Sequence, residues 1–205
     1  EDLDFTIRKE IANDELVSRL NETLDNLEKE QGLQFAVPSE KIEKRADSLT
    51  AYVNFVGPLQ ARLDSRSIKV DFTLSEKLIF PIASKVVHSP YSDTISKSFA
   101  TYSLEEIIVE KLCAIISRTE PRDIYDVNYL FGINDIDFHS IPDAFHEKAE
   151  FKGIDPARLK NSLNDKKDKY VRMWESRLKH QIKNLPHLDE VIRELNRNLR
   201  RYDLY

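Results

Sequence analysis

Polar and apolar residues alternate at the start of the chain, and the spacing then becomes helical. Residues 2–7 alternate in the manner of a strand with one buried face. From residue 14 to residue 31 the apolar positions recur every three or four residues. The sequence therefore predicts a helix over 14–31, with Asn13 as its N-cap and Gly32 just beyond its end.

Three further segments have the character of strands. Residues 50–56 and 68–74 are rich in β-branched and aromatic side chains, and turn-forming residues, among them Gly57-Pro58, separate the two. Residues 33–37 predict a shorter strand that Pro38 ends, and residues 79–87 are also expected to be extended. The first half of the chain thus predicts a small mixed sheet.

Helical spacing resumes near residue 103 and continues to the end of the chain. Ser103 and Glu106 have the spacing of a capping box, which predicts a helix to about residue 117. Pro121 suits the first turn of a second helix that ends near Gly132, and further starts occur near residues 140, 155 and 187. We therefore predict an α+β fold, with a mixed sheet and flanking helices in residues 1–100 and an all-helical part in residues 101–205.

Composition narrows the class of protein. The chain has 205 residues, of which 33% are charged, and no apolar run is long enough to span a membrane. The first residues lack the basic and apolar stretches of a signal peptide, and the single Cys113 excludes an internal disulfide. A cytoplasmic location is expected.

The net charge of −5 argues against a general nucleic-acid coat protein, but the C-terminal third is basic. Its cations form either solvated helix faces or a surface for phosphates.

Three aspartates are candidate metal ligands. Asp2 and Asp4 are two residues apart in a predicted strand, so their carboxylates project from the same face. Asp71 alternates with apolar neighbours in a second strand and lies on the face opposite them. If the two strands pair, three carboxylates converge. Such a cluster binds hard divalent cations, usually Mg²⁺, which carry the phosphates of a nucleotide. Strand aspartates that simply face solvent are the alternative.

A second group of charged residues lies at the junction of the two predicted helices after residue 103. Lys111 interrupts an otherwise apolar helix, and it is either a lysine at the edge of the apolar face or a phosphate ligand. Arg122 and Asp123 begin the next helix, where the macrodipole favours an aspartate. For Asp123, a structural salt bridge to Lys111 or Arg118 and a catalytic role are both consistent with the spacing.

These residues resemble the signature of AbiEii-like nucleotidyltransferases. That family shows an E-E-I-hydrophobic-x-E-K-L-x-A helix, then an arginine, then P-R-D-hydrophobic-Y-D. The opening residues 1–5 are similar to the end of its first motif, usually S-E-D-L-D-F, and residues 70–73 are similar to its third-carboxylate strand. The resemblance spans the whole chain, and its specific part is the R-D-x-Y-D segment. The matching residues of the helical signature are Glu105-Glu106-Ile107, Glu110-Lys111-Leu112, Arg118 and Pro121 to Asp126.

The resemblance implies a function and a role for each candidate. Asp2, Asp4 and Asp71 would hold Mg²⁺, and Asp71 would also help to deprotonate the acceptor hydroxyl. Lys111 and Arg122 would bind the nucleotide, so the helical part would contribute to the site, with Asp123 as an essential partner.

The implied activity is transfer of a nucleotidyl group from a nucleoside triphosphate to an acceptor, with RNA such as tRNA as a candidate. The protein would be the toxin of a toxin–antitoxin or phage-defence pair, with an antitoxin encoded nearby.

One feature departs from the family. The family has a Gly-Ser turn about ten residues before the aspartates, and this sequence lacks it. We therefore expect an N-terminally truncated chain. A non-catalytic module that binds a nucleotide or a partner is the alternative function.

Overall fold

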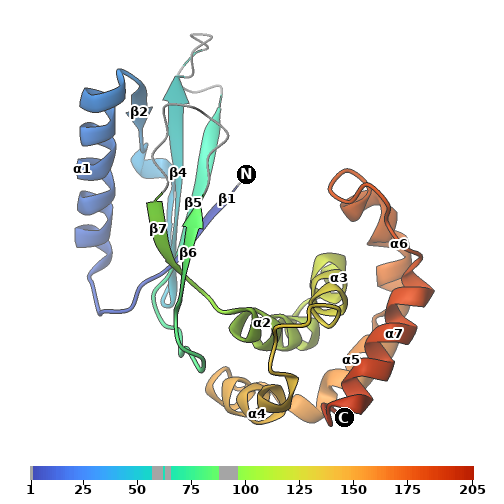
Figure 1. The fold of residues 1–205 in the computed structure, drawn as a ribbon. Helices are drawn as coiled ribbons and strands as arrows, with labels where there is room; N and C mark the ends of the chain where they lie inside the picture. Colours follow the sequence, from blue (N-terminus) through green and yellow to red (C-terminus); the bar gives the residue numbers. More distant parts are fainter. Residues whose placement is uncertain (1, 57–61, 63–65, 88–96) are drawn as a thin grey trace. The chain divides into compact units, whose positions relative to one another are not determined.

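The computed structural model of the chain describes residues 2–56, 62, 66–87 and 97–205 (Figure 1). The chain divides into two compact units, Glu1–Glu76 and Lys77–Tyr205. Each unit has its own hydrophobic core. Among the described residues, no helix has both the length and the apolar character needed to cross a membrane.

The first unit, here called the sheet unit, is built on a mixed sheet in the order β1-β5-β4-β2, with β3 also paired to β4 (Figure 1). β1 runs parallel to β5, whereas β4 is antiparallel to β5, β2 and β3. The predicted strands at the start of the chain and around residues 50–56 and 68–74 are confirmed, while β3 was not predicted. The strands are β1 (Asp2–Thr6), β2 (Gln34–Ala36), β3 (Ile42–Lys44), β4 (Ser48–Val56) and β5 (Ser67–Thr73), and a short 3-10 helix, η1 (Ser39–Lys41), precedes β3.

One face of this sheet packs against the helix α1 (Asn13–Gln31) and holds the core. Alternation places every second side chain of β4 and β5 on that face, where Leu49, Ala51, Val53, Val70 and Phe72 are buried with Leu16 of α1. The opposite face carries the polar residues of the same strands. The turn predicted at Gly57-Pro58 lies outside the described residues.

The ends of α1 confirm one sequence prediction and contradict another. Gly32 has a φ of 65°, and its backbone N–H donates to the carbonyl of Glu28, as expected of a glycine that ends a helix. Asn13 is not the N-cap, because the helix already includes Asn13, and Ala12 precedes it without a side-chain cap. A run of polar residues can start a helix at several neighbouring positions, so the first residue is poorly fixed by sequence.

The second unit, here called the helical unit, begins with a two-stranded hairpin and continues as a helical bundle (Figure 1). The hairpin pairs β6 (Ala83–Val87) with β7 (Lys97–Thr101), of which β7 was not predicted. The helices are α2 (Leu104–Ser117), α3 (Pro121–Leu130), α4 (Ile141–Phe151), α5 (Leu159–Asp165), α6 (Lys167–Leu178) and α7 (Leu188–Arg201), with the 3-10 turns η2 (Phe138–Ser140) and η3 (Pro156–Arg158).

The segment before the hairpin belongs to the helical unit because Glu106 of α2 holds it there. Ser103 caps α2 as predicted, since its hydroxyl accepts from the backbone N–H of Glu106. The Glu106 side chain does not return to Ser103. It is buried and accepts from the backbone N–H groups of Ile79 and Phe80, at 2.9 and 2.8 Å. Both of these residues also pack against the helical core. The units therefore divide at residues 76 and 77, whereas the spacing of apolar residues changes near residue 103.

Candidate functional site

The polar face of the sheet brings the predicted aspartates onto two neighbouring strands. In the parallel pairing of β1 with β5, Asp4 lies directly beside Asp71 and Asp2 lies beside Lys69. Adjacent strands are about 4.8 Å apart, and residues of equal parity share a face. Asp2, Asp4 and Asp71 thus project from the same face, which is the face that α1 does not cover.

Two neighbouring side chains, Thr50 and Lys69, hold the carboxylate of Asp71. One carboxylate oxygen accepts from the hydroxyl of Thr50 on β4 at 2.5 Å, and the other is paired with the Lys69 ammonium. Partial burial would raise the pKa of Asp71, but the hydrogen bonds from Lys69 and Thr50 outweigh it and lower the pKa. The bond to Asp71 correspondingly raises the pKa of Lys69. Asp71 is therefore a carboxylate at neutral pH.

The donor set suits a hard divalent cation. Asp2 and Asp4 are exposed, and three carboxylates on one face supply the oxygen atoms that Mg²⁺ prefers. In the arrangement seen, however, no group of three or more His, Cys, Asp or Glu side chains among the described residues converges closely enough to hold a metal ion. The Lys69 ammonium occupies one oxygen of Asp71 instead. A cation bound by these residues would therefore take the place of Lys69.

In the helical unit, Asp123 is the centre of an ion-pair network that joins α2 to α3. Its carboxylate is fully buried, and Arg118 binds it in a bidentate manner, with Nε at 2.7 Å and Nη2 at 2.8 Å. Lys111 Nζ donates to the same carboxylate at 3.1 Å and also pairs with Asp126 at 2.7 Å. Burial alone would raise the pKa of Asp123, but Arg118 and Lys111 lower it.

The salt bridges that the spacing allowed are thus present, to both Lys111 and Arg118. Both carboxylate oxygens of Asp123 are occupied by these cations, so Asp123 fixes the positions of Lys111 and Arg118. Arg118 lies just after the C-terminal end of α2.

Lys166 caps that end of α2. The Nζ of Lys166 donates to the carbonyls of Ile115, Ile116 and Arg118 at 2.7 to 2.9 Å. Burial, with Arg158 and Lys169, lowers the pKa of Lys166.

Arg122 differs from its two basic neighbours. It lies in the first turn of α3 with an exposed side chain, and it has no ion-pair partner among the residues that the structure describes. Lys111 is only partly exposed and is already shared between two aspartates. Arg122 is therefore the cation of this group that is freest to meet a negatively charged ligand.

Sequence reasoning did not single out Lys69, Thr50 or Lys166. For Lys69 a signal exists, because it has the same parity as Asp71 in a predicted strand and must share its face. Thr50 and Lys166 carry no such signal. Their partners lie 21 and about 50 residues away, so only the tertiary fold identifies them.

The sequence matches a family model described as "Nucleotidyl transferase AbiEii toxin, Type IV TA system" over residues 1–195. Two solved structures share the fold. One is the protein JHP933 from Helicobacter pylori, with 17% identity and a TM-score of 0.54 over 98% of this chain and 75% of that chain. The other is an H. pylori protein proposed to be a nucleotidyltransferase, with 18% identity and a TM-score of 0.52 over 98% and 77%. Among curated protein sequences, none matches this chain.

Proposed function

The chain belongs to the AbiEii nucleotidyltransferase toxin family of type IV toxin–antitoxin systems, and we propose that it transfers a nucleotidyl group from a nucleoside triphosphate to an RNA acceptor with the help of Mg²⁺. Membership of the family implies a nucleoside triphosphate substrate and an antitoxin counterpart. The RNA acceptor, the metal and the residue roles below are our proposal.

The observation that carries the proposal is the register of β1 with β5. It sets Asp4 beside Asp71, with Asp2 on the same face, in a family of nucleotidyltransferases. Asp2, Asp4 and Asp71 would hold Mg²⁺. When bound there, the ion would neutralise the triphosphate and favour attack on the α-phosphate.

Asp71 has a second role in this proposal. Its lowered pKa keeps it unprotonated, and the hydrogen bond from Thr50 fixes the direction of its carboxylate. A carboxylate held in this way can accept the proton of an acceptor hydroxyl as that hydroxyl attacks. Lys69 neutralises Asp71 until substrate arrives.

Residues of the helical unit would bind the triphosphate. Arg122 and Lys111 are the cations for its phosphates, since Arg122 is exposed and Lys111 is partly exposed. Asp123 is a positioning residue in this scheme. It orients Lys111 and Arg118 through its two oxygens. Replacing it would disturb both cations without removing a group that touches the substrate.

Transfer of labelled nucleotide to RNA in the presence of Mg²⁺ tests the proposal. Wild type should label RNA, and Asp71→Asn should not, because asparagine supplies neither a metal-binding charge nor a proton acceptor. Asp25→Asn is the matched control, since Asp25 is an exposed aspartate on α1, the helix that covers the opposite face of the sheet. Labelling by Asp71→Asn at the wild-type rate would disprove the role of Asp71. Binding of triphosphate by wild type without any transfer would favour the non-catalytic alternative.

A further inference from the structure

Three aromatic side chains in the helical unit form a continuous row from α3 to α6. Tyr125 and Tyr129 are one helical turn apart, and their rings stack with centroids 6.3 Å apart and planes 15° apart. On its other side, the Tyr125 ring lies 6.5 Å from the ring of Trp174 at 58°. We call this row, Tyr129, Tyr125 and Trp174, the aromatic ladder.

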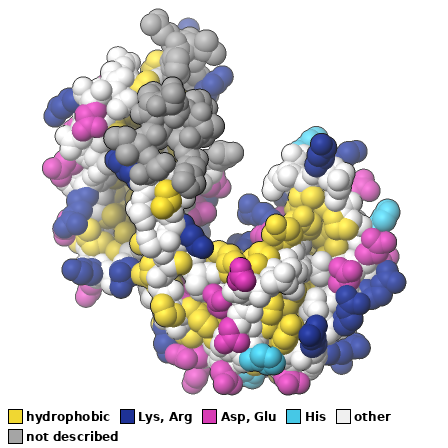
Figure 2. All heavy atoms as spheres, viewed as in Figure 1, with side chains coloured by type: hydrophobic (Ala, Val, Ile, Leu, Met, Phe, Trp, Pro, Cys, Tyr) yellow, Lys and Arg dark blue, Asp and Glu magenta, His cyan; other side chains and the backbone are white. Residues whose placement is uncertain are grey.

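The ladder is buried at one end and open at the other. Trp174 is 4% exposed, and its Nε1 donates to the carbonyl of Pro186 at 2.9 Å. Tyr129 is 62% exposed although its ring is held parallel to that of Tyr125. Val171 of α6 is also exposed. In Figure 2, hydrophobic side chains gather on the helical unit over α3 and α6. An ordered aromatic ring that solvent reaches is a surface for another flat, apolar group.

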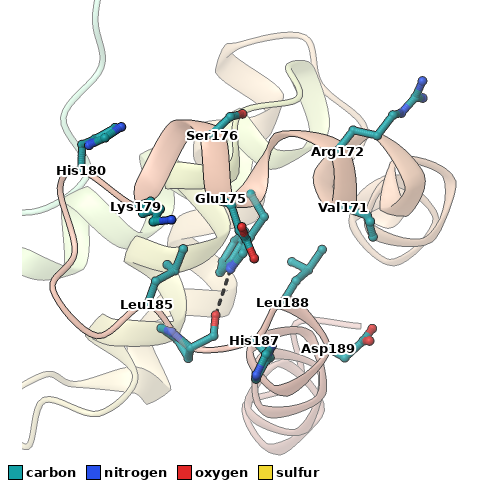
Figure 3. Close-up of a pocket in the computed structure, with 12 residues that line it drawn as sticks. Val171, Arg172, Glu175, Ser176, Lys179, His180, Leu185, His187, Leu188 and Asp189 are labelled. Carbon is teal, nitrogen blue, oxygen red and sulfur yellow. Dashed lines mark hydrogen bonds between the residues drawn. The ribbon is translucent and has the colours of Figure 1, made fainter.

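A cavity of about 620 Å³ adjoins the buried end of the ladder. It lies between α6 and the segment that leads into α7 (Figure 3), and both Trp174 and Val171 line it. The remaining lining is largely polar and includes Arg172, Lys179, His180 and His187 together with Glu175 and Asp189. The neighbourhood of the ladder thus combines apolar rings with hydrogen-bonding groups and with charged groups of both signs.

The C-terminal segment that carries Trp174 has a net charge opposite in sign to that of the whole chain. Residues 159–205 contain twelve Lys and Arg against seven Asp and Glu, whereas the complete chain has a net charge of −5. Arg172 follows Val171 on α6 and is exposed. A negatively charged ligand is therefore attracted to this part of the molecule in particular.

We infer that the aromatic ladder and its flanking cations dock an unpaired segment of the acceptor RNA, with one base stacked on Tyr129. Every base has an apolar face that stacks on an aromatic ring, and unpaired bases are free to do so. Bases within a duplex are already covered by their neighbours. Exposed cations among residues 159–205, such as Arg172, would contact the phosphates of a strand longer than one nucleotide. This inference rests on the proposed function, since it names where the RNA acceptor binds.

The only tryptophan of the chain makes the test direct. Trp174 belongs to the ladder, so its fluorescence reports on ligands that bind there. We would titrate the protein with a short single-stranded RNA, with the same RNA annealed to its complement, and with a nucleoside triphosphate alone. The single strand should change the fluorescence most strongly. Tyr129→Ala should bind it roughly 5- to 150-fold more weakly, which is the loss of one base–aromatic stack. Tyr129→Phe keeps the ring and should bind like wild type.

Phe151→Ala is the matched control. It removes another exposed aromatic side chain, from α4 and away from the ladder, and should leave RNA affinity unchanged. Equal affinity of Tyr129→Ala and wild type would overturn the inference, as would equal binding of duplex and single strand. A Tyr129-dependent signal with triphosphate alone would assign the ladder to the nucleotide and also overturn it.

Failure of the docking inference is separable from failure of the proposed function. Asp71→Asn should keep Tyr129-dependent RNA binding while losing transfer, because Asp71 is not part of the ladder. Transfer that persists at full rate in Tyr129→Ala with unchanged RNA affinity would refute the docking site and leave the enzyme activity intact. RNA binding without transfer in wild type would refute the activity and leave the docking site in place.

Discussion

Replacing Asp123 with asparagine should destabilise the helical unit far more than the same replacement at Asp126. Both aspartates lie on α3 and both pair with Lys111, so the comparison is closely matched. They differ in burial and in number of contacts. Asp123 is 0% exposed and receives three hydrogen bonds of 2.7 to 3.1 Å, whereas the side chain of Asp126 is 34% exposed and has one ion pair at 2.7 Å.

The magnitude follows from these environments. Removing one partner of a buried ion pair costs about 3–5 kcal/mol, and an exposed pair contributes less than about 1 kcal/mol. Arg118 has a side-chain exposure of 55% and can be solvated, and Lys111 keeps Asp126. We therefore expect the lower end for Asp123→Asn, about 3 kcal/mol.

Urea denaturation followed by the fluorescence of Trp174 measures this loss, because the only tryptophan lies in the helical unit. With a slope of about 2 kcal/mol per molar, the midpoint should fall by about 1.5 M for Asp123→Asn and by less than about 0.5 M for Asp126→Asn. Equal shifts for the two variants would refute the reasoning.

The pH dependence provides a second check on Asp123. Burial would raise its pKa, but Arg118 and Lys111 lower it below the value in the unfolded chain. The stability that this carboxylate contributes is therefore complete above the unfolded pKa of about 3.9 and is lost as the pH falls through the lower folded value. The difference in stability between wild type and Asp123→Asn should shrink below about pH 4. A difference that stays constant down to pH 2 would contradict the assigned ion pairs.

Three further replacements test the packing of the two units. Lys148→Met should lower stability by about 3–5 kcal/mol, seen in the urea midpoint, because it leaves the buried Glu106 without its cation at 2.7 Å. Gly32→Ala should cost about 1–2 kcal/mol in thermal denaturation, since alanine is strained at a φ of 65° although nothing lies within 4 Å of its Cβ; an unchanged midpoint would argue against this conformation. Tyr170→Phe should be neutral or stabilise the fold by up to about 1–3 kcal/mol, because the buried hydroxyl has no hydrogen-bond partner among the described residues. Burial raises the pKa of Tyr170 to about 12, with Asp123 and Glu120 adding to the shift, so this hydroxyl stays neutral. A clear loss of stability in Tyr170→Phe would reveal a partner, such as a bound water.

The elements with regular patterns could be predicted from the sequence. The strands β4 and β5 alternate along their length, and α2 combines a capping serine with an apolar stripe. The strands β3 and β7 were missed because their sequences, I-E-K and K-S-F-A-T, are short and largely polar. They are extended because a neighbouring strand supplies their hydrogen bonds, as β4 does for β3. Such pairing is a tertiary effect that no local pattern records.

The capping box at Ser103 and Glu106 was predicted correctly as a helix start, but only one of its two hydrogen bonds forms. The spacing from Ser103 predicts two reciprocal hydrogen bonds, and only the one accepted by the serine is formed. The glutamate side chain instead accepts from two backbone amides 26 and 27 residues away and pairs with Lys148, 42 residues away. Since burial of a carboxylate requires such partners, the fold determines the contacts of this side chain more strongly than its helix does.

The alternation of side chains along the strands likewise predicted which face carries the aspartates, but it did not predict which cation offsets the repulsion between them. Parity places Asp2, Asp4 and Asp71 on one face, and the parallel register sets Asp4 directly beside Asp71. Like charges opposite one another destabilise a sheet by themselves. Lys69 offsets this repulsion, because it pairs with Asp71 and is attracted to Asp2, and Arg45 adds a weaker attraction to Asp71. The same ammonium is the group that a divalent cation would displace. Lys69 therefore stabilises the three carboxylates when no cation is bound, and a divalent cation must bind strongly enough to replace the Lys69–Asp71 ion pair.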